Sequence, residues 1–281
     1  MIRSYLVCAT QRSGSTLLCE LLKDTGVAGR PEEYFEARRE TGLPPHPGDY
    51  LGDLPRTGAG IRDDPSPPQA PPHSSLQGLT SYREHLERTF RLGTTANGVF
   101  GAKLMWSQVA ELHSLTRDLP EFAQLEPFAL LERLFGGPRY VRVTRRDKVR
   151  QAVSLWRALQ TRSWRREHAP GDTRPLQLHY RFEGLQHLVR ALEAEDAAWG
   201  EFLAAHDVPA LTIVYEDDLE TDRDRSVRAV LQHIGVEPPP GWRPKEVIER
   251  QADALSDEWA AAYHRDAAQG GVGTNVALPV R

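Results

Sequence analysis

The chain has 281 residues, of which 40% are apolar and 26% are charged, and its formal net charge at pH 7 is −4. This composition is typical of a soluble globular protein, and the length is sufficient for one α/β domain with a substantial core. Because the chain is weakly acidic and has no basic block, it is a poor candidate for a nucleic-acid-binding protein, and we expect no nucleic-acid partner.

The N-terminus and the cysteines indicate the compartment. The chain begins almost directly with a predicted strand, which leaves no room for a signal peptide, and no apolar run reaches the length of a membrane span. Cys8 and Cys19 fall inside a predicted strand and a predicted helix, which is typical of small buried side chains. The histidines and cysteines lack metal-ligand spacing. We therefore expect a cytoplasmic protein with no membrane insertion and no metal.

The first predicted strand, turn and helix form the most informative stretch of the chain. An apolar run at residues 5–9 precedes a polar turn, and a helix is predicted over about 13–25. The unpaired N–H groups and the dipole of such a helix start favour an anion. The turn resembles the nucleotide P-loop, but Ala9 stands for its first glycine and Ser15 for its lysine, while Arg12 supplies a cation. An ordinary turn with a Ser or Thr cap is the alternative. The candidate anion-binding residues are Gln11, Arg12, Ser13, Gly14, Ser15 and Thr16.

The next segment carries two acidic residues. We predict a brief strand at 27–28, which would present Glu32 and Glu33 at its carboxyl end, the edge where open parallel sheets bind ligands. From about 38 to 74 the chain is rich in proline and glycine and has little periodicity. We predict a loop insertion there, either a lid, a substrate-facing segment or a partly disordered one.

A strand predicted over 99–105 is apolar except for Lys103, and a charge inside a buried strand needs a partner, which a ligand anion would supply. A strand at 139–144 then ends at Arg145 and Arg146, where a long basic helix begins. Val153, Trp156, Gln160 and Trp164 share one face of that helix. This face is either a core stripe or an aromatic wall that stacks a sugar or a nucleobase.

The remaining elements complete an alternating pattern. Helices are predicted over about 81–93, 108–115, 128–135, 182–206 and 222–234, a strand over 211–215, and a final helix that Ser256 would cap. Strands that alternate with helices predict an α/β fold with a P-loop-like, doubly wound, mostly parallel central sheet flanked by helices. We expect a single domain over residues 1–281.

Five blocks together resemble the actinobacterial sulfotransferases that use 3′-phosphoadenosine 5′-phosphosulfate (PAPS) and are typified by trehalose 2-sulfotransferase. The blocks are residues 9–18, 26–35, 98–106, 145–164 and 249–259. The resemblance implies an enzyme that moves a sulfuryl group from PAPS to a hydroxyl of a carbohydrate or sugar-bearing small molecule and releases adenosine 3′,5′-bisphosphate (PAP). The resemblance implies that the reaction requires no metal, and it leaves open whether the protein forms a homodimer.

The resemblance also assigns the nucleotide site. Arg145 and Ser154 correspond to the residues that hold the 3′-phosphate, with Arg146 as a rival for the first role. Arg145 at the strand end and Ser154 on the following helix can both contact one phosphate. Arg250 corresponds to a C-terminal clamp over the nucleotide.

The catalytic residues implied by the resemblance are Glu33 as base, with Arg12 and Lys103 stabilising the departing group. Met105 occupies the position of the histidine base of vertebrate relatives and cannot accept a proton. Burial beside an acceptor would raise the pKa of Glu33. The candidate substrate-binding residues are Arg30, Glu33, Tyr34, Trp106, Trp156 and Gln160.

Three points stay open at this stage. Arg30 and Tyr34 replace a Glu and a Phe of the trehalose enzymes, so trehalose itself is one acceptor among several. A P-loop phosphotransferase is one alternative function, although it would need a lysine at position 15 and a Mg²⁺-holding carboxylate, for which Asp217 is the candidate. The other alternative is a non-catalytic module that binds PAP.

Overall fold

The computed structural model describes residues 3–55, 59–61, 72–162, 178–244, 254–270 and 276–278. Contacts group the chain into two compact units. Unit 1 comprises Met1–Pro44, Pro68–Arg146 and Glu195–Glu249, and unit 2 comprises Pro45–Pro67, Asp147–Ala194 and Arg250–Arg281. The expectation of a single domain stays a prediction.

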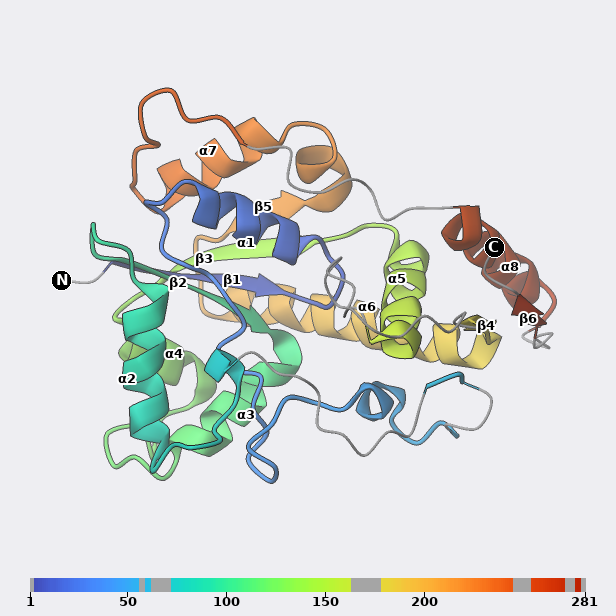
Figure 1. The fold of residues 1–281 in the computed structure, drawn as a ribbon, viewed down its shortest axis with the longest axis horizontal. Helices are drawn as coiled ribbons and strands as arrows, with labels where there is room; N and C mark the ends of the chain where they lie inside the picture. The colour runs from blue at the N-terminus through green and yellow to red at the C-terminus, as the bar shows by residue number, and fades with distance from the viewer. Residues whose placement is uncertain are drawn as a thin grey trace. The chain divides into compact units, whose positions relative to one another are not determined.

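Unit 1 contains a four-stranded parallel sheet (Figure 1). Its strands are β1 (Arg3–Ala9), β2 (Val99–Met105), β3 (Arg139–Thr144) and β5 (Leu211–Val214), and their order in the sheet is β2-β1-β3-β5. The chain leaves β1 for β2 on one side and then returns to β3 on the other side. The doubly wound α/β prediction is therefore confirmed, and the strand order reverses at β1, where such folds bind ligands.

Alternate side chains of β1 enter two separate cores, as the period of a buried strand requires. Tyr5 and Val7 pack with α1 (Ser15–Asp24) and α7 (Arg223–His233) on one face of the sheet. Leu6 and Cys8 belong to the core of the other face. That face is covered by α2 (Tyr82–Gly93), α3 (Trp106–Thr116), α4 (Pro127–Phe135) and the last turns of α6 (Phe182–Ala205). Cys8 and Cys19 are buried free thiols, as expected.

Unit 2 has its own core, in which Trp156 and Trp259 are fully buried. It contains α5 (Lys148–Thr161), the first turns of α6, α8 (Ala254–Ala268) and an antiparallel pair, β4 (Leu178–Tyr180) with β6 (Val276–Leu278). The sequence did not predict this pair, because each strand has only three residues. No helix of the described ranges is both long and apolar enough to cross a membrane.

Two local predictions were wrong. Residues 27–28 form no strand, because their carbonyls bond side chains of Asn97 and Tyr5 instead of a neighbouring strand. Ser256 lies inside α8 and does not cap it, and its hydroxyl accepts a hydrogen bond from Arg157 at 2.6 Å.

The insertion at 38–74 also has structure of its own. It contains a 3₁₀ helix, η1 (Pro47–Leu51), that His46 and Asp49 cap, and a second one, η2 (Pro72–Ser74). Leu51 is buried in the core of unit 2. The described part of the insertion is therefore more ordered than its composition indicates, because its apolar residues contribute to a core. Its role as a lid stays a prediction.

Candidate active site

The turn after β1 forms a tight cradle, which is the candidate anion site. Trp199 anchors its start by donating its Nε1–H to the carbonyl of Ala9 at 3.0 Å. Arg12 and Gly14 then have φ values of 61° and 95°, in the left-handed region. A Cβ at Gly14 would lie 2.4 Å from the ring of Tyr215, so both the backbone and the packing require glycine there. The turn is therefore tight, and α1 begins directly after Gly14.

The cradle offers donors to a ligand. The first N–H groups of α1 have no partner within the helix, and the helix dipole adds positive potential. Ser13 is fully buried, and its Oγ has no hydrogen-bond partner among the described residues. A buried hydroxyl without a partner is costly unless a ligand satisfies it. The anion site predicted from residues 11–16 therefore has a physical basis in the fold.

Lys103 joins this cradle from β2. Its side chain is only 4% exposed, and Nζ lies 2.5 Å from Oε1 of Glu33. The same Nζ donates to Oγ1 of Thr16 at 3.0 Å. Burial opposes the charge, but Glu33, Cys19 and Glu36 outweigh it, so the pKa of Lys103 is raised. Lys103 is therefore a cation held between the cradle and a carboxylate.

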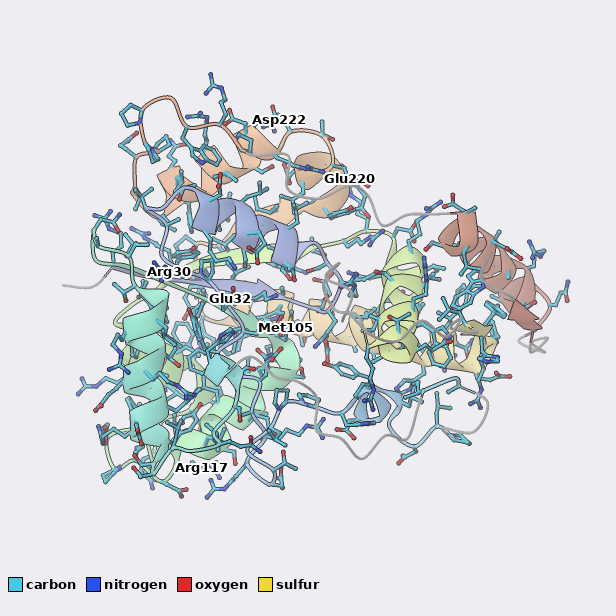
Figure 2. All side chains as sticks on the ribbon, viewed as in Figure 1. Arg30, Glu32, Met105, Arg117, Glu220 and Asp222 are labelled. Carbon is cyan, nitrogen blue, oxygen red and sulfur yellow. The ribbon has the colours of Figure 1, made fainter. Side chains whose placement is uncertain are left out.

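The segment that carries Glu33 runs alongside β2. The N–H of Lys103 donates to the carbonyl of Glu32 at 3.0 Å, and Figure 2 shows Arg30 and Glu32 beside β2, with Met105 at its end. This pairing places Glu33 at the carboxyl edge of the sheet although residues 27–28 form no strand. Glu33 therefore lies at the predicted edge of the sheet, but the pairing with β2 places it there and not a strand at residues 27–28.

Glu33 is a strongly stabilised carboxylate, with 22% of its side chain exposed. Burial works against its charge, but Lys103, together with hydrogen bonds from Glu36, Lys103 and Gln108, lowers its pKa to about 2. Gln108 Nε2 donates to Oε2 of Glu33 at 3.2 Å. The expected rise in the pKa of Glu33 is thus absent from this state, because the resident partner is a cation and not an acceptor hydroxyl.

Sequence reasoning missed Glu36 and Gln108. Gln108 had a detectable signal, since it is the third residue of α3 and its Oε1 accepts the N–H of Met105 at 3.0 Å, as in a capping box. Glu36 had no such signal in the sequence, because only the folded segment brings its carboxyl group next to that of Glu33.

Two arginines follow β3 with different surroundings. Arg145 lies 4.7 Å over the ring of Tyr215, and its Nε lies 3.8 Å from Glu216. Arg146 is 64% exposed and forms an ion pair with Asp217, with one contact at 2.6 Å. Because that pair already occupies Asp217, the geometry gives no support to Asp217 as a Mg²⁺ ligand. Arg145 is thus less exposed than Arg146, and the assignment of either to a phosphate stays a prediction.

The other predicted substrate residues of unit 1 have structural partners. Tyr34 is 2% exposed and donates its hydroxyl to the Arg30 carbonyl at 2.7 Å. Trp106 packs edge-on against Trp199, with ring centroids 5.1 Å apart. Arg30 is exposed, and Gln11 is buried at the turn. No described contact favours Tyr34 or Trp106 as an acceptor ligand, and both assignments stay predictions.

Unit 2 contains three predicted site residues on α5. Trp156 is fully buried and donates its Nε1–H to the His179 carbonyl at 2.7 Å. Gln160 bonds both backbone groups of His179, at 2.9 and 2.7 Å. These contacts favour the core-stripe interpretation of that face. Ser154 lies on the same helix, and its role beside Arg145 stays a prediction. Arg250 lies outside the described residues.

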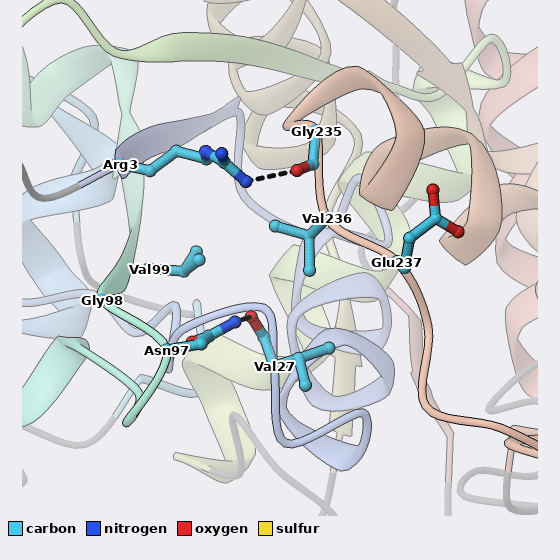
Figure 3. Close-up of a pocket in the computed structure, with 8 residues that line it drawn as sticks. All are labelled: Arg3, Val27, Asn97, Gly98, Val99, Gly235, Val236 and Glu237. Carbon is cyan, nitrogen blue, oxygen red and sulfur yellow. Dashed lines mark hydrogen bonds between the residues drawn. The ribbon is translucent and has the colours of Figure 1, made fainter.

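A separate pocket in unit 1 lies away from this site (Figure 3). Its lining residues are Arg3, Val27, Asn97, Gly98, Val99, Gly235, Val236 and Glu237. Arg3 and Val99 begin β1 and β2, so the pocket lies at the amino edge of the sheet, opposite the anion cradle. Within the described ranges, no cluster of three or more His, Cys, Asp or Glu side chains could hold a metal ion.

Comparison with known proteins gives consistent results. Residues 4–266 match the Stf0 sulphotransferase family. The chain is 36% identical over 270 residues to "Trehalose 2-sulfotransferase" of Mycolicibacterium smegmatis, and the alignment covers 96% of this chain and 97% of that protein. It is also 36% identical over 281 residues to "Trehalose 2-sulfotransferase" of Mycobacterium tuberculosis, with 97% and 98% covered.

Proposed function

Because the chain belongs to the Stf0 sulphotransferase family and is therefore a sulfotransferase, we propose that its donor is PAPS and its acceptor a hydroxyl of a carbohydrate. The family implies a sulfuryl donor and a small-molecule acceptor. The phosphotransferase and the non-catalytic module are set aside, since neither is a sulfotransferase. Location in the cytoplasm and a homodimer stay predictions.

The observation that carries the proposal is the contact of Lys103 with both Glu33 and Thr16. One residue, Thr16, belongs to the anion cradle, and the other, Glu33, is a carboxylate able to accept a proton. Lys103 thus brings the group that would stabilise the donor next to the group that would activate the acceptor. Proximity of this kind is a large part of what an enzyme contributes.

The residues present fit a phosphosulfate. The start of α1, the Ser13 hydroxyl and the side chains of Arg12 and Lys103 would hold it. When bound, PAPS supplies the sulfuryl group. Arg145, Ser154 and Arg250 would hold its 3′-phosphate, as the resemblance implies.

Glu33 would take the proton of the acceptor hydroxyl as the oxygen attacks sulfur in line with the departing phosphate. Lys103 must first leave Glu33 and turn to the oxygen on which negative charge develops. Its departure removes the main partner that lowers the pKa of Glu33, so that Glu33 becomes a stronger base at the moment when it is needed.

The relatives are named as trehalose enzymes, and a trehalose-like disaccharide is the first acceptor to test. Glycolipid precursors and sugar-bearing natural products follow, because Arg30 is exposed and, as the resemblance implies, stands where the trehalose enzymes have a Glu. The test incubates the chain with ³⁵S-labelled PAPS and each acceptor and separates the products. Labelled sugar is the expected result. Labelled inorganic sulfate alone would mean that the acceptor is of another class, and no release from PAPS would contradict the donor.

A further inference from the structure

Glu36 and Glu33 form a carboxyl pair. Their side chains lie within hydrogen-bonding reach of each other, and Glu36 also lies within reach of the side chain of Ser74, which is fully buried. An ionised carboxylate only accepts hydrogen bonds, so two carboxyl groups this close repel each other unless one of them carries a proton and donates it to the other. The pair therefore holds one proton, as closely spaced carboxyl groups do elsewhere.

The surroundings place that proton on Glu36. Lys103 lies 2.5 Å from Glu33, and Gln108 donates to Glu33 at 3.2 Å, so Glu33 is the ionised member. Burial and the charge of Glu33 raise the pKa of Glu36 well above its ordinary value, while Lys103 and Ser74 oppose the shift less strongly.

Among the described residues, the groups that face Glu36 are Glu33 of its own segment, Lys103 of β2 and the Ser74 hydroxyl. Two cationic or titratable residues of α2 lie against the same part of the fold and have other partners. His85 bonds the Tyr34 carbonyl at 2.9 Å, and Arg88 bonds the Ser75 carbonyl at 2.7 Å.

We propose that Glu36 is a positioning residue that keeps one proton beside Glu33, so that the carboxyl pair presents a single negative charge to Lys103. The inference rests on the proposed function, in which Lys103 leaves Glu33 for the sulfuryl donor. Leaving one carboxylate in a buried site costs less than leaving two. Ionisation of Glu36 therefore holds Lys103 on the pair and slows the transfer.

The proton balance of the transfer does not involve Glu36. The acceptor O–H bond breaks and its proton goes to Glu33, while a new S–O bond forms. The S–O bond to the 5′-phosphate breaks, and PAP leaves with that electron pair. Glu36 keeps its proton throughout, which distinguishes it from the base.

The first test compares pH–rate profiles of wild type and Glu36→Gln. The amide N–H donates to Glu33 as the protonated acid does, but it cannot ionise. Wild-type turnover should fall at alkaline pH as Glu36 ionises. Glu36→Gln should keep turnover near neutral pH, losing far less than the about 10² to 10⁴ expected for loss of a base, and it should lack this alkaline fall.

Two further variants sharpen the profile test. Ser74→Ala removes a hydrogen bond that favours ionised Glu36, so the alkaline fall should move to higher pH. Glu32→Gln is the matched control, because the neighbouring Glu32 forms an ion pair with Lys23, and its profile should match wild type. An unchanged alkaline fall in Glu36→Gln would overturn the proposal. A loss as large as that of Glu33→Gln would make Glu36 the base and would overturn it as well.

A second test needs no turnover and so separates this inference from the proposed function. Infrared spectroscopy of the protein without donor should detect a protonated carboxyl band at neutral pH that Glu36→Gln lacks. Both proteins should carry Glu195→Gln, because burial raises the pKa of Glu195 to about 7 and its band would interfere. Bands that do not differ between the two proteins would mean that Glu36 is ionised, and the proposal would fail even if sulfuryl transfer is found.

Discussion

At the scale of single residues, Glu33 is the group on which catalysis should depend most. Glu33→Gln keeps the size and part of the hydrogen bonding but cannot take a proton, so turnover should fall by about 10² to 10⁴. Affinity for PAP should change little, since the anion cradle is intact. Turnover of labelled PAPS and calorimetry with PAP measure the two effects. Wild-type turnover in Glu33→Gln would exclude Glu33 as the base, whereas Glu32→Gln should behave as wild type.

A second residue-scale prediction concerns Glu195 of α6. Its Oε2 is buried without a hydrogen-bond partner among the described residues, and burial raises its pKa to about 7. The unfolded chain ionises this group at a lower pH, near about 4.3. Stability from Glu195 is thus fully present below the unfolded pKa and is lost as pH rises towards 7. At about 1.4 kcal/mol for each pKa unit, the loss is on the order of 4 kcal/mol.

Glu195→Gln should remove this pH dependence. Urea unfolding should find the variant more stable than wild type at pH 8, with a much smaller difference at pH 4. Glu193→Gln, at an exposed position of the same helix, is the control and should change the unfolding free energy little at either pH. An equal effect of Glu195→Gln at both pH values would show that Glu195 does not titrate with a raised pKa.

At the scale of elements, the turn between β1 and α1 depends on one glycine. Gly14→Ala forces an L side chain into the left-handed region and against the ring of Tyr215 at 2.4 Å. The backbone cost alone is roughly 1–2 kcal/mol, and the displaced turn should also lose the anion site. Gly26→Ala is a matched control, since Gly26 has φ of 70° but no atom within 4 Å of the added Cβ.

The comparison of these variants uses thermal unfolding and PAP calorimetry. Both should lower the unfolding free energy, but only Gly14→Ala should also abolish PAP binding. If Gly26→Ala weakened PAP binding as much, general loss of stability would explain the result. If Gly14→Ala still bound PAP as wild type does, the cradle would not be the nucleotide site.

At the scale of the whole molecule, a chain of net charge −4 should bind a highly anionic nucleotide through cations gathered locally. Arg12, Lys103 and Arg145 would supply this charge, so PAP should bind equally well with and without a chelator. Arg145→Ala should weaken PAP far more than adenosine 5′-phosphate, because only PAP has the 3′-phosphate. Calorimetry checks both. Binding that needs Mg²⁺, or equal losses for the two nucleotides, would contradict the assignment.

Local sequence patterns were sufficient for much of this protein. The apolar run of β1, the polar turn and the amphipathic α1 are encoded by neighbouring residues, and alternation of strands with helices predicted the sheet. Motif resemblance identified the family. The same local logic failed for residues 27–28 and Ser256, where side-chain partners from elsewhere in the chain replace the expected backbone pairing or cap.

Only the tertiary structure decided the protonation of the candidate site. Glu33 and Lys103 lie 70 positions apart in the sequence. The segment that carries Glu33 runs along β2, which carries Lys103, and this brings the two side chains to 2.5 Å. That contact reverses the expected direction of the pKa of Glu33, while burial and the charge of Glu33 raise the pKa of Glu36. Sequence spacing specifies periodicity and caps, whereas the energy of a buried charge depends on which distant groups the packed fold places beside it.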